Sequence, residues 1–168
     1  MSMFTADILS LAQNIICEFT TAKKMISTAE SCTGGLIAGA LTEISGSSSV
    51  FDRGFVTYTN TAKIEMLGVQ ERTLESFGAV SEETAVQMAH GALFRSRADV
   101  AVAVTGIAGP SGGSPEKPVG LVYLAAKSRN GELIRRKMLY GDIGRGKVRL
   151  ATVQTALEML IELQESRA

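Results

Sequence analysis

Apolar residues recur every three or four positions in three long stretches of the chain, which is the spacing that places them on one face of an α-helix. These stretches cover residues 5–21, 82–95 and 147–164. Thr5 and Ser81 stand at the starts of the first two, and both are residue types that cap helix N-termini. The pattern therefore predicts three amphipathic helices, with shorter helical spacing after residue 36 and over residues 60–67, where Asn60 is the expected cap.

Between the predicted helices lie short apolar runs typical of β-strands, at residues 24–29, 54–58, 99–104, 121–126 and 133–139. Apart from Asp99 at its start, the run 99–104 is apolar, which indicates a strand buried on both faces in the middle of a sheet. The last two runs are separated by a segment that contains Asn130-Gly131, a strong hairpin signal. Strands that alternate with helices form parallel pairs, whereas a hairpin is antiparallel. We therefore expect a single three-layer α/β domain over residues 1–168, with a mixed sheet covered by helices.

Length and charge narrow the classes of protein that this fold can serve. A chain of 168 residues fits one domain. Its 17 basic and 17 acidic residues balance, so no overall positive field favours nucleic acid or an anionic membrane. No apolar run approaches the 18 or so residues needed to span a bilayer. The only cysteines are Cys17 and Cys32, and the start of the chain lacks a secretory-signal pattern, so we expect a cytoplasmic protein.

A candidate nucleophile lies in the turn Glu30-Ser31-Cys32-Thr33-Gly34-Gly35, between a predicted strand and a predicted helix. Unpaired N–H groups at a helix N-terminus attract negative charge, so a nucleophile with an oxyanion hole fits this position. Ser31 and Cys32 are the two rivals for that role. A simpler interpretation is that Ser31 or Thr33 caps the helix.

Candidates for a general base follow the predicted strand at residues 54–58. The only histidine, His90, lies in the predicted helix 82–95 and away from its apolar face, which disfavours a histidine-based triad. A base must then come from lysine, tyrosine or a carboxylate. Tyr58 and Lys63 both follow the strand end closely enough to face a crevice at the sheet edge, although a solvated helix position is the usual place for a lysine.

The glycine-rich loop that begins at Thr105 and Gly106 follows the buried strand, and ligands of open α/β sheets bind beyond strand carboxyl ends. The loop is not a P-loop, and no G-x-G-x-x-G fingerprint follows a first strand. One histidine and two cysteines do not make the usual zinc ligand set. We therefore expect a site without a metal ion or an organic cofactor.

Four blocks of sequence resemble one known family. They are TAESCTGGL at 28–36, GSS at 46–48 with Phe51 and Gly54, YTNTAK at 58–63, and TGIAGPSGG with EKPVG at 105–120. In this order they resemble the C-terminal domain of the competence/damage-inducible protein CinA, the nicotinamide-nucleotide amidohydrolase family. The resemblance covers nearly the whole chain. It implies hydrolysis of nicotinamide mononucleotide to nicotinic acid mononucleotide and ammonia, a step that returns a pyridine nucleotide to NAD synthesis.

The resemblance also implies roles for individual residues, and the positions carried over are Ser31, Ser48, Tyr58, Lys63, Thr105 and Arg145. Ser31 would attack the carboxamide, Lys63 would take its proton, and Tyr58 would orient Lys63 or pass a proton to ammonia. The substrate-binding set would comprise Thr33, Gly34, Gly35, Ser48, Thr105, Gly106 and Arg145, with oxyanion donors near Thr33, Gly34 or Gly106 and the phosphate near Arg145. The family's Gly-Asp-Arg appears here as GDIGR at 141–145, so assigning Arg145 requires a two-residue shift or depends on Val148-Arg149 setting the register.

Two other classes of function remain open from the sequence. The first is a regulatory module that binds a pyridine nucleotide without turning it over. The second is a scaffold for DNA-uptake partners, which only the family name suggests. Balanced charge and few aromatic residues weaken direct nucleic-acid binding. A small-molecule nucleotide is therefore the expected partner, and a homo-oligomer stays open.

Overall fold

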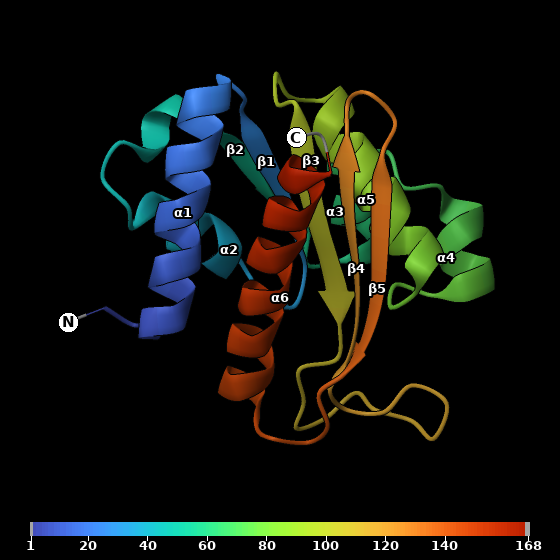
Figure 1. The fold of residues 1–168 in the computed structure, drawn as a ribbon. Helices are drawn as coiled ribbons and strands as arrows, with labels where there is room; N and C mark the ends of the chain where they lie inside the picture. The colour runs from blue at the N-terminus through green and yellow to red at the C-terminus, as the bar shows by residue number, and fades with distance from the viewer. Residues whose placement is uncertain (1, 167–168) are drawn as a thin grey trace.

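Five strands form one mixed sheet in the computed structural model, which describes residues 2–166 (Figure 1). The strands stand in the order β2-β1-β3-β4-β5. The first three are parallel and the last two are antiparallel to their neighbours. Their bounds are Ile26–Glu30 (β1), Phe51–Val56 (β2), Val100–Gly106 (β3), Leu121–Ser128 (β4) and Leu133–Leu139 (β5). The predicted mixed sheet with a late hairpin is confirmed.

Helices cover both faces of this sheet (Figure 1). Three of them pack on one face: α1 (Ala6–Ala22), α2 (Leu36–Thr42) and α6 (Arg145–Glu165). The other face carries α3 (Asn60–Leu67), α4 (Glu71–Phe77) and α5 (Glu82–Phe94). The three-layer architecture is therefore also confirmed. No helix within residues 2–166 combines the length and the hydrophobicity needed to cross a membrane.

The central strand β3 shows why the two faces take different helices. Val100, Val102 and Val104 pack into the cluster with α1, α2 and α6. The alternate residues Ala101 and Ala103 face α5. All five are buried, as the continuous apolar run predicts. Because Ala101 and Ala103 present only methyl groups to α5, the helix can approach this part of the strand closely.

Side-chain caps begin α1, α3 and α5, and the cap of α3 differs from the prediction by one residue. Thr5 accepts a hydrogen bond from the Ile8 N–H at 3.3 Å, and Ser81 accepts one from the Thr84 N–H at 3.2 Å, as predicted. The expected cap of α3 is wrong by one residue. Thr59 fills that position and accepts from the Ala62 N–H at 3.0 Å, because its backbone is extended while residue 60 is already helical.

Three elements differ from what the periodic pattern predicts. Strand β2 begins at Phe51 rather than at residue 54, because pairing with β1 extends it across polar positions. Helix α4 was not predicted, since its seven residues contain too few apolar positions to show a period. Helix α6 begins at Arg145, two residues earlier than expected, and this places Arg145 in its first turn.

The parallel strands end at the same edge of the sheet. After β1 the chain crosses to β2 by α2 on one face, and after β2 it crosses to β3 by α3 to α5 on the other. Crossovers to opposite faces leave a crevice at the carboxyl ends of adjacent strands. The segments that follow β1, β2 and β3 meet in this crevice.

Candidate active site

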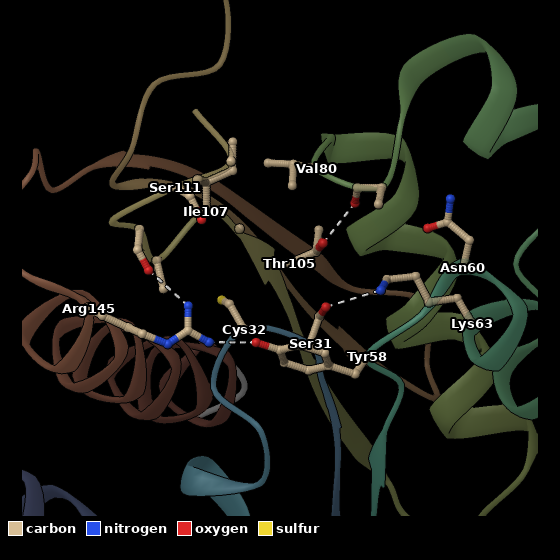
Figure 2. Close-up of a pocket in the computed structure, with 15 residues that line it drawn as sticks. Ser31, Cys32, Tyr58, Asn60, Lys63, Val80, Thr105, Ile107, Ser111 and Arg145 are labelled. Atoms are coloured by element: carbon tan, nitrogen blue, oxygen red, sulfur yellow. Dashed lines mark hydrogen bonds between the residues drawn. The ribbon is translucent and has the colours of Figure 1, made fainter. Parts of the chain in front are cut away.

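A pocket of about 250 Å³ occupies the crevice at the carboxyl ends of β1, β2 and β3 (Figure 2). Its walls come from the turn after β1, the start of α3, the glycine-rich loop after β3 and the start of α6. The lining residues are Ser31, Cys32, Tyr58, Asn60, Lys63, Ala79, Val80, Thr105, Gly106, Ile107, Ala108, Gly109, Ser111, Gly112 and Arg145. Six of the ten residues named from the sequence as catalytic or substrate-binding are thus brought together.

The side chains of Ser31 and Lys63 point toward each other in this pocket (Figure 2). Lys63 Nζ lies 3.0 Å from Ser31 Oγ and donates to the Thr57 carbonyl oxygen at 2.8 Å. Ser31 is held by its own N–H, which donates to the Val104 carbonyl at 3.1 Å and so extends the pairing of β1 with β3. Nucleophile and amine are therefore within direct proton-transfer distance.

Lys63 is only 1% exposed, although lysine is usually solvated. Four salt bridges are formed among residues 2–166, and none of them includes Lys63. Burial without a paired carboxylate penalises the ammonium form, so desolvation lowers the pKa of Lys63 below its usual range, against a smaller opposing effect of Cys32. The amine is thereby made a better proton acceptor near neutral pH.

Cys32, the rival nucleophile, lines the same pocket and is buried. Burial raises the pKa of its thiol to about 11, with the nearby Glu30 carboxylate adding to the effect. The reactive form of cysteine is the thiolate. At pH 7 only about one molecule in ten thousand carries it. The electrostatics therefore favour Ser31 over Cys32.

Glu30 occupies the N-terminus of α2, where the sequence had suggested an oxyanion hole. Its buried carboxylate accepts from the Ile37 N–H at 2.8 Å and the Ala38 N–H at 3.0 Å. It also accepts from the hydroxyls of Thr33 at 2.7 Å and Thr28 at 3.3 Å. The helix end already holds an anion from the chain itself, so these N–H groups are not available to a substrate.

Three residues expected to bind substrate lie in the turn between β1 and α2 and do not line the pocket. Thr33 spends its hydroxyl on Glu30, and the Gly34 N–H donates to the Ser31 carbonyl at 3.0 Å. Gly35 caps α2 with a positive φ and faces Val56. They fix the backbone that carries Ser31, and none of the three lines the pocket.

Ser48 is also displaced from the pocket. It lies exposed in a short 3-10 turn, η1 (Ser47–Ser49), which leads into the amino end of β2. The pocket is at the carboxyl end of the same strand, and six strand residues span about 20 Å. The expected hydroxyl contact from Ser48 is therefore not made within this chain.

Arg145 bridges the mouth of the pocket (Figure 2). Its guanidinium donates to the Tyr58 hydroxyl at 2.6 Å and to the Gly109 carbonyl at 2.9 Å. Tyr58 is 56% exposed, and its hydroxyl contacts Arg145 rather than Lys63. The proposed use of Tyr58 to orient Lys63 is therefore corrected: the Thr57 carbonyl does this instead.

Thr105 and Gly106 form the floor of the pocket at the end of β3. The Thr105 hydroxyl donates to the Ala79 carbonyl at 2.7 Å, which ties the loop before α5 to the sheet. Gly106 has no room for a side chain, since a Cβ there would lie 2.6 Å from Val122 Cγ2. The backbone of residue 106 therefore faces the pocket directly.

Three contributors to the site escaped the sequence reasoning. Asn60 lines the pocket beside Lys63, whereas the pattern treated it as a helix cap. Glu30 and Arg149 hold the turn around Ser31. Arg149 donates to the carbonyls of Cys32 and Thr33, each at 3.1 Å. In the sequence, Glu30 stands directly before the candidate nucleophile. Its partners on α2, the N–H groups of Ile37 and Ala38, could be identified only from the structure.

His90 lies outside this pocket. His90 is exposed on α5 and lies near Lys127, at 3.5 Å, in a different surface region. Within the described part of the chain, no three His, Cys, Asp or Glu side chains gather closely enough to hold a metal ion.

Comparison with known proteins adds an independent line of evidence. A family model described as the CinA C-terminal domain matches residues 8–164. The nicotinamide-nucleotide amidohydrolase PncC of Escherichia coli K12 is 47% identical over 159 residues, which cover 94% of this chain and 95% of that protein. PncC of Enterobacter agglomerans is 54% identical over 142 residues, or 82% and 85% of the two chains. A CinA-like protein of Akkermansia muciniphila is 52% identical over 91% of this chain, which spans only 37% of that longer protein.

Solved structures show the same fold. The crystal structure of the competence/damage inducible protein CihA from Agrobacterium tumefaciens matches with a TM-score of 0.96 and 70% identity, over 97% of this chain and 99% of that one. A CinA-superfamily protein from Escherichia coli matches with a TM-score of 0.89 and 35% identity, over 97% and 94%.

The four hydrogen bonds of Glu30 predict a large effect of Glu30→Gln on stability. The amide offers one acceptor oxygen, and its NH₂ group would face donors, so buried N–H groups lose their partner. We expect the free energy of unfolding to fall by about 2–4 kcal/mol, measured by urea denaturation. Hydrogen exchange of the Ile37 and Ala38 amides should accelerate. Glu43→Gln, on an exposed acid at the end of α2, is the matched control and should change stability by less than about 0.5 kcal/mol; equal losses in the two variants would contradict the assignment.

Proposed function

The chain belongs to the CinA C-terminal domain family, and from this premise we propose that it hydrolyses the carboxamide of nicotinamide mononucleotide to nicotinic acid mononucleotide and ammonia. The observation that carries the proposal is the 3.0 Å contact between Ser31 Oγ and the buried Lys63 Nζ, in a pocket with Arg145 at its mouth. Relatives named nicotinamide-nucleotide amidohydrolase support the substrate.

The first half of the reaction uses Ser31 as the nucleophile and Lys63 as the base. Ser31 Oγ attacks the carboxamide carbon, whose carbonyl is made electrophilic by the attached pyridinium ring, while its proton passes to the neutral Lys63 amine. The tetrahedral intermediate then loses its C–N bond. The Lys63 ammonium returns the proton to the departing nitrogen, which leaves as ammonia and gives an ester on Ser31.

Water completes the reaction by the same path. Lys63, neutral again, takes a proton from water as it attacks the ester carbon, and then protonates Ser31 Oγ as the C–O bond breaks. The product is the pyridine carboxylate, and the pair of residues returns to its starting state. Because Lys63 has no carboxylate partner, it can alternate between base and acid without breaking an ion pair.

The Gly106 N–H is the donor that we assign to the oxyanion. Along a strand of an antiparallel pair, every second residue directs its N–H and C=O groups to the partner strand. The Ile107 N–H donates to the Leu121 carbonyl of β4 at 2.9 Å. The N–H of Gly106 therefore faces β1, where the Ser31 carbonyl already accepts from the Gly34 N–H. A donor beside the nucleophile, at the pocket floor, suits a developing negative charge.

Arg145 is the residue that we assign to the substrate phosphate. It lies in the first turn of α6, whose N-terminus has no side-chain cap, and helix N-termini favour anions. The guanidinium can form paired, charge-assisted bonds with phosphate oxygens. In exchange it would release the Tyr58 hydroxyl and the Gly109 carbonyl, both of which are neutral acceptors.

Ammonia release from nicotinamide mononucleotide by the pure protein is the direct test of function. We expect Ser31→Ala to abolish release while keeping nucleotide binding, because the attacking oxygen is removed. Cys32→Ala should keep most of the activity, because the thiol is held in its unreactive form. Full activity in Ser31→Ala would exclude the serine mechanism. Tight nucleotide binding by a parent protein that releases no ammonia would favour the regulatory module instead.

Lys63→Met removes the proton acceptor and retains much of the apolar volume. We expect turnover to fall by about 10²–10⁴-fold with substrate affinity nearly unchanged, measured by single-turnover kinetics. The parent rate should rise with pH through the lowered pKa of Lys63, because only the neutral amine accepts a proton, and the variant should lack this rise. Lys137→Met, on an exposed lysine of β5, should behave like the parent.

The stability of Lys63→Met provides a check that needs no substrate. In the parent the Lys63 amine binds its proton less tightly in the folded state than in the unfolded state, so unfolding takes up protons. The parent should therefore gain stability relative to the variant as pH rises from the lowered pKa toward about 10.5. A stability difference that does not change with pH would mean that Lys63 titrates normally.

Arg145→Ala should weaken substrate binding by about 10–100-fold in KM with little change in kcat, since the lost bonds involve a charged group worth about 1.5–3 kcal/mol. Free nicotinamide, which lacks the phosphate, should be a poor substrate and equally poor for both proteins. Lys147→Ala, on an exposed lysine of the same helix end, is the control. Equal catalytic efficiency of the parent on nucleotide and free base would refute phosphate anchoring.

A further inference from the structure

Thr57 carries an unexplained polar atom next to the base. Its hydroxyl oxygen is the one buried side-chain oxygen or nitrogen, among the residues that the structure describes, without a hydrogen-bond partner. The residue is fully buried. A buried hydroxyl without a partner costs about 1–3 kcal/mol in proteins, so such a group calls for a reason other than stability.

The surroundings of Thr57 place this hydroxyl on the same side of the sheet as Lys63. The Thr57 N–H donates to the Glu30 carbonyl at 2.9 Å, which continues the pairing of β2 with β1 by one residue. Side chains alternate along a strand. Val56 faces Gly35 at the start of α2, so Thr57 faces the opposite layer, from which α3 delivers Lys63.

Lys63 in turn has one donor more than it has described acceptors. A lysine ammonium group carries three N–H donors. One is directed to Ser31 Oγ and one to the Thr57 carbonyl oxygen. Within residues 2–166, no further hydrogen bond or salt bridge of Lys63 is formed. The Thr57 hydroxyl thus lacks a donor, and the Lys63 ammonium group lacks a third acceptor. The two residues are already joined by a 2.8 Å hydrogen bond.

We propose that the Thr57 hydroxyl is the third hydrogen-bond acceptor of the Lys63 ammonium group, engaged when Lys63 takes the proton of Ser31. This rests on the proposed role of Lys63 as base. The Ser31 O–H bond breaks, a new N–H bond forms on Lys63, and a rotation of Thr57 about its Cα–Cβ bond brings its oxygen to the third N–H. Thr57 is then a positioning residue, because it acts on the base and not on the substrate.

The proposal explains why a polar residue occupies this buried position. An acceptor for the charged form raises proton affinity, which offsets part of the desolvation of Lys63 and keeps the amine basic enough to accept a proton. Substitution of Thr57 changes none of the other charged or titratable groups around the pocket end of Lys63. These groups are Glu30 at the end of β1, Cys32 after β1, Tyr58 after β2, and Arg145 and Arg149 on α6. Substitution of Thr57 therefore isolates the hydroxyl.

The test measures the titration of Lys63 itself by NMR of protein labelled with ¹³C at the lysine ε-carbon, with the signal identified by its absence in Lys63→Met. Thr57→Val keeps the branched shape and removes the hydroxyl. We expect its Lys63 midpoint to move toward lower pH by about one unit, since the ammonium form loses an acceptor. Thr57→Ser, which keeps the hydroxyl, should titrate close to the parent.

Urea unfolding separates this role from a structural one. Because the hydroxyl has no partner in the resting protein, Thr57→Val should unfold at a urea concentration equal to or above that of the parent. Thr73→Val is the matched control: Thr73 is buried on α4 and accepts from the Gln87 side chain at 2.8 Å, so its loss should lower the unfolding midpoint and leave the Lys63 titration unchanged.

Two results would overturn the proposal: an unchanged Lys63 midpoint in Thr57→Val, or equal shifts in Thr57→Val and Thr57→Ser. The titration requires no substrate, so its outcome is independent of whether the parent releases ammonia from nicotinamide mononucleotide. A parent without amidohydrolase activity would refute the proposed function and leave the titration result standing.

Discussion

Burial of the Lys63 amine at the end of β1 is the constraint on which the site depends. The amine reaches Ser31 because α3 starts soon after β2, so the Thr57 carbonyl and Lys63, six residues apart, come together. Removal from water makes the amine a usable base, and the same removal costs stability. The surrounding structure must therefore hold this arrangement in place.

Two charged residues outside the reacting pair provide that support. Glu30 ties the end of β1 to the first turn of α2 through two backbone N–H groups, and it accepts two more hydrogen bonds from hydroxyls of β1 and the turn. Arg149 ties the same turn to α6 through two carbonyls. The turn that carries Ser31 is thus fixed from both sides. These two groups have most of their polar partners within the fold, whereas Lys63 retains an unpaired donor. The groups that stabilise the backbone are therefore distinct from those proposed to exchange protons.

In the proposed reaction the pocket also separates chemistry from recognition. Ser31 and Lys63 are buried where the strands end. Arg145 and Tyr58 lie at its mouth, where the guanidinium is solvated and can exchange partners at low cost. A substrate with an anionic group at one end and an amide at the other fits this polarity.

The sequence by itself determined the layered fold, because the periods of its apolar residues are local properties of the chain. The lack of a suitable histidine left lysine, tyrosine or a carboxylate as candidate bases, and the resemblance to a known family then selected Ser31 and Lys63. The sequence did not determine helix α4 or the first turn of α6, because their boundaries depend on packing rather than on a period. Only the tertiary structure showed that Glu30 fills the end of α2, that Thr33, Gly34 and Gly35 lie behind the pocket, and that Ser48 is a strand length away. The physical reason is that a hydrogen bond or a desolvated charge is decided by partners distant in sequence: Arg149 reaches Cys32 across 117 positions, and Lys63 reaches Ser31 across 32.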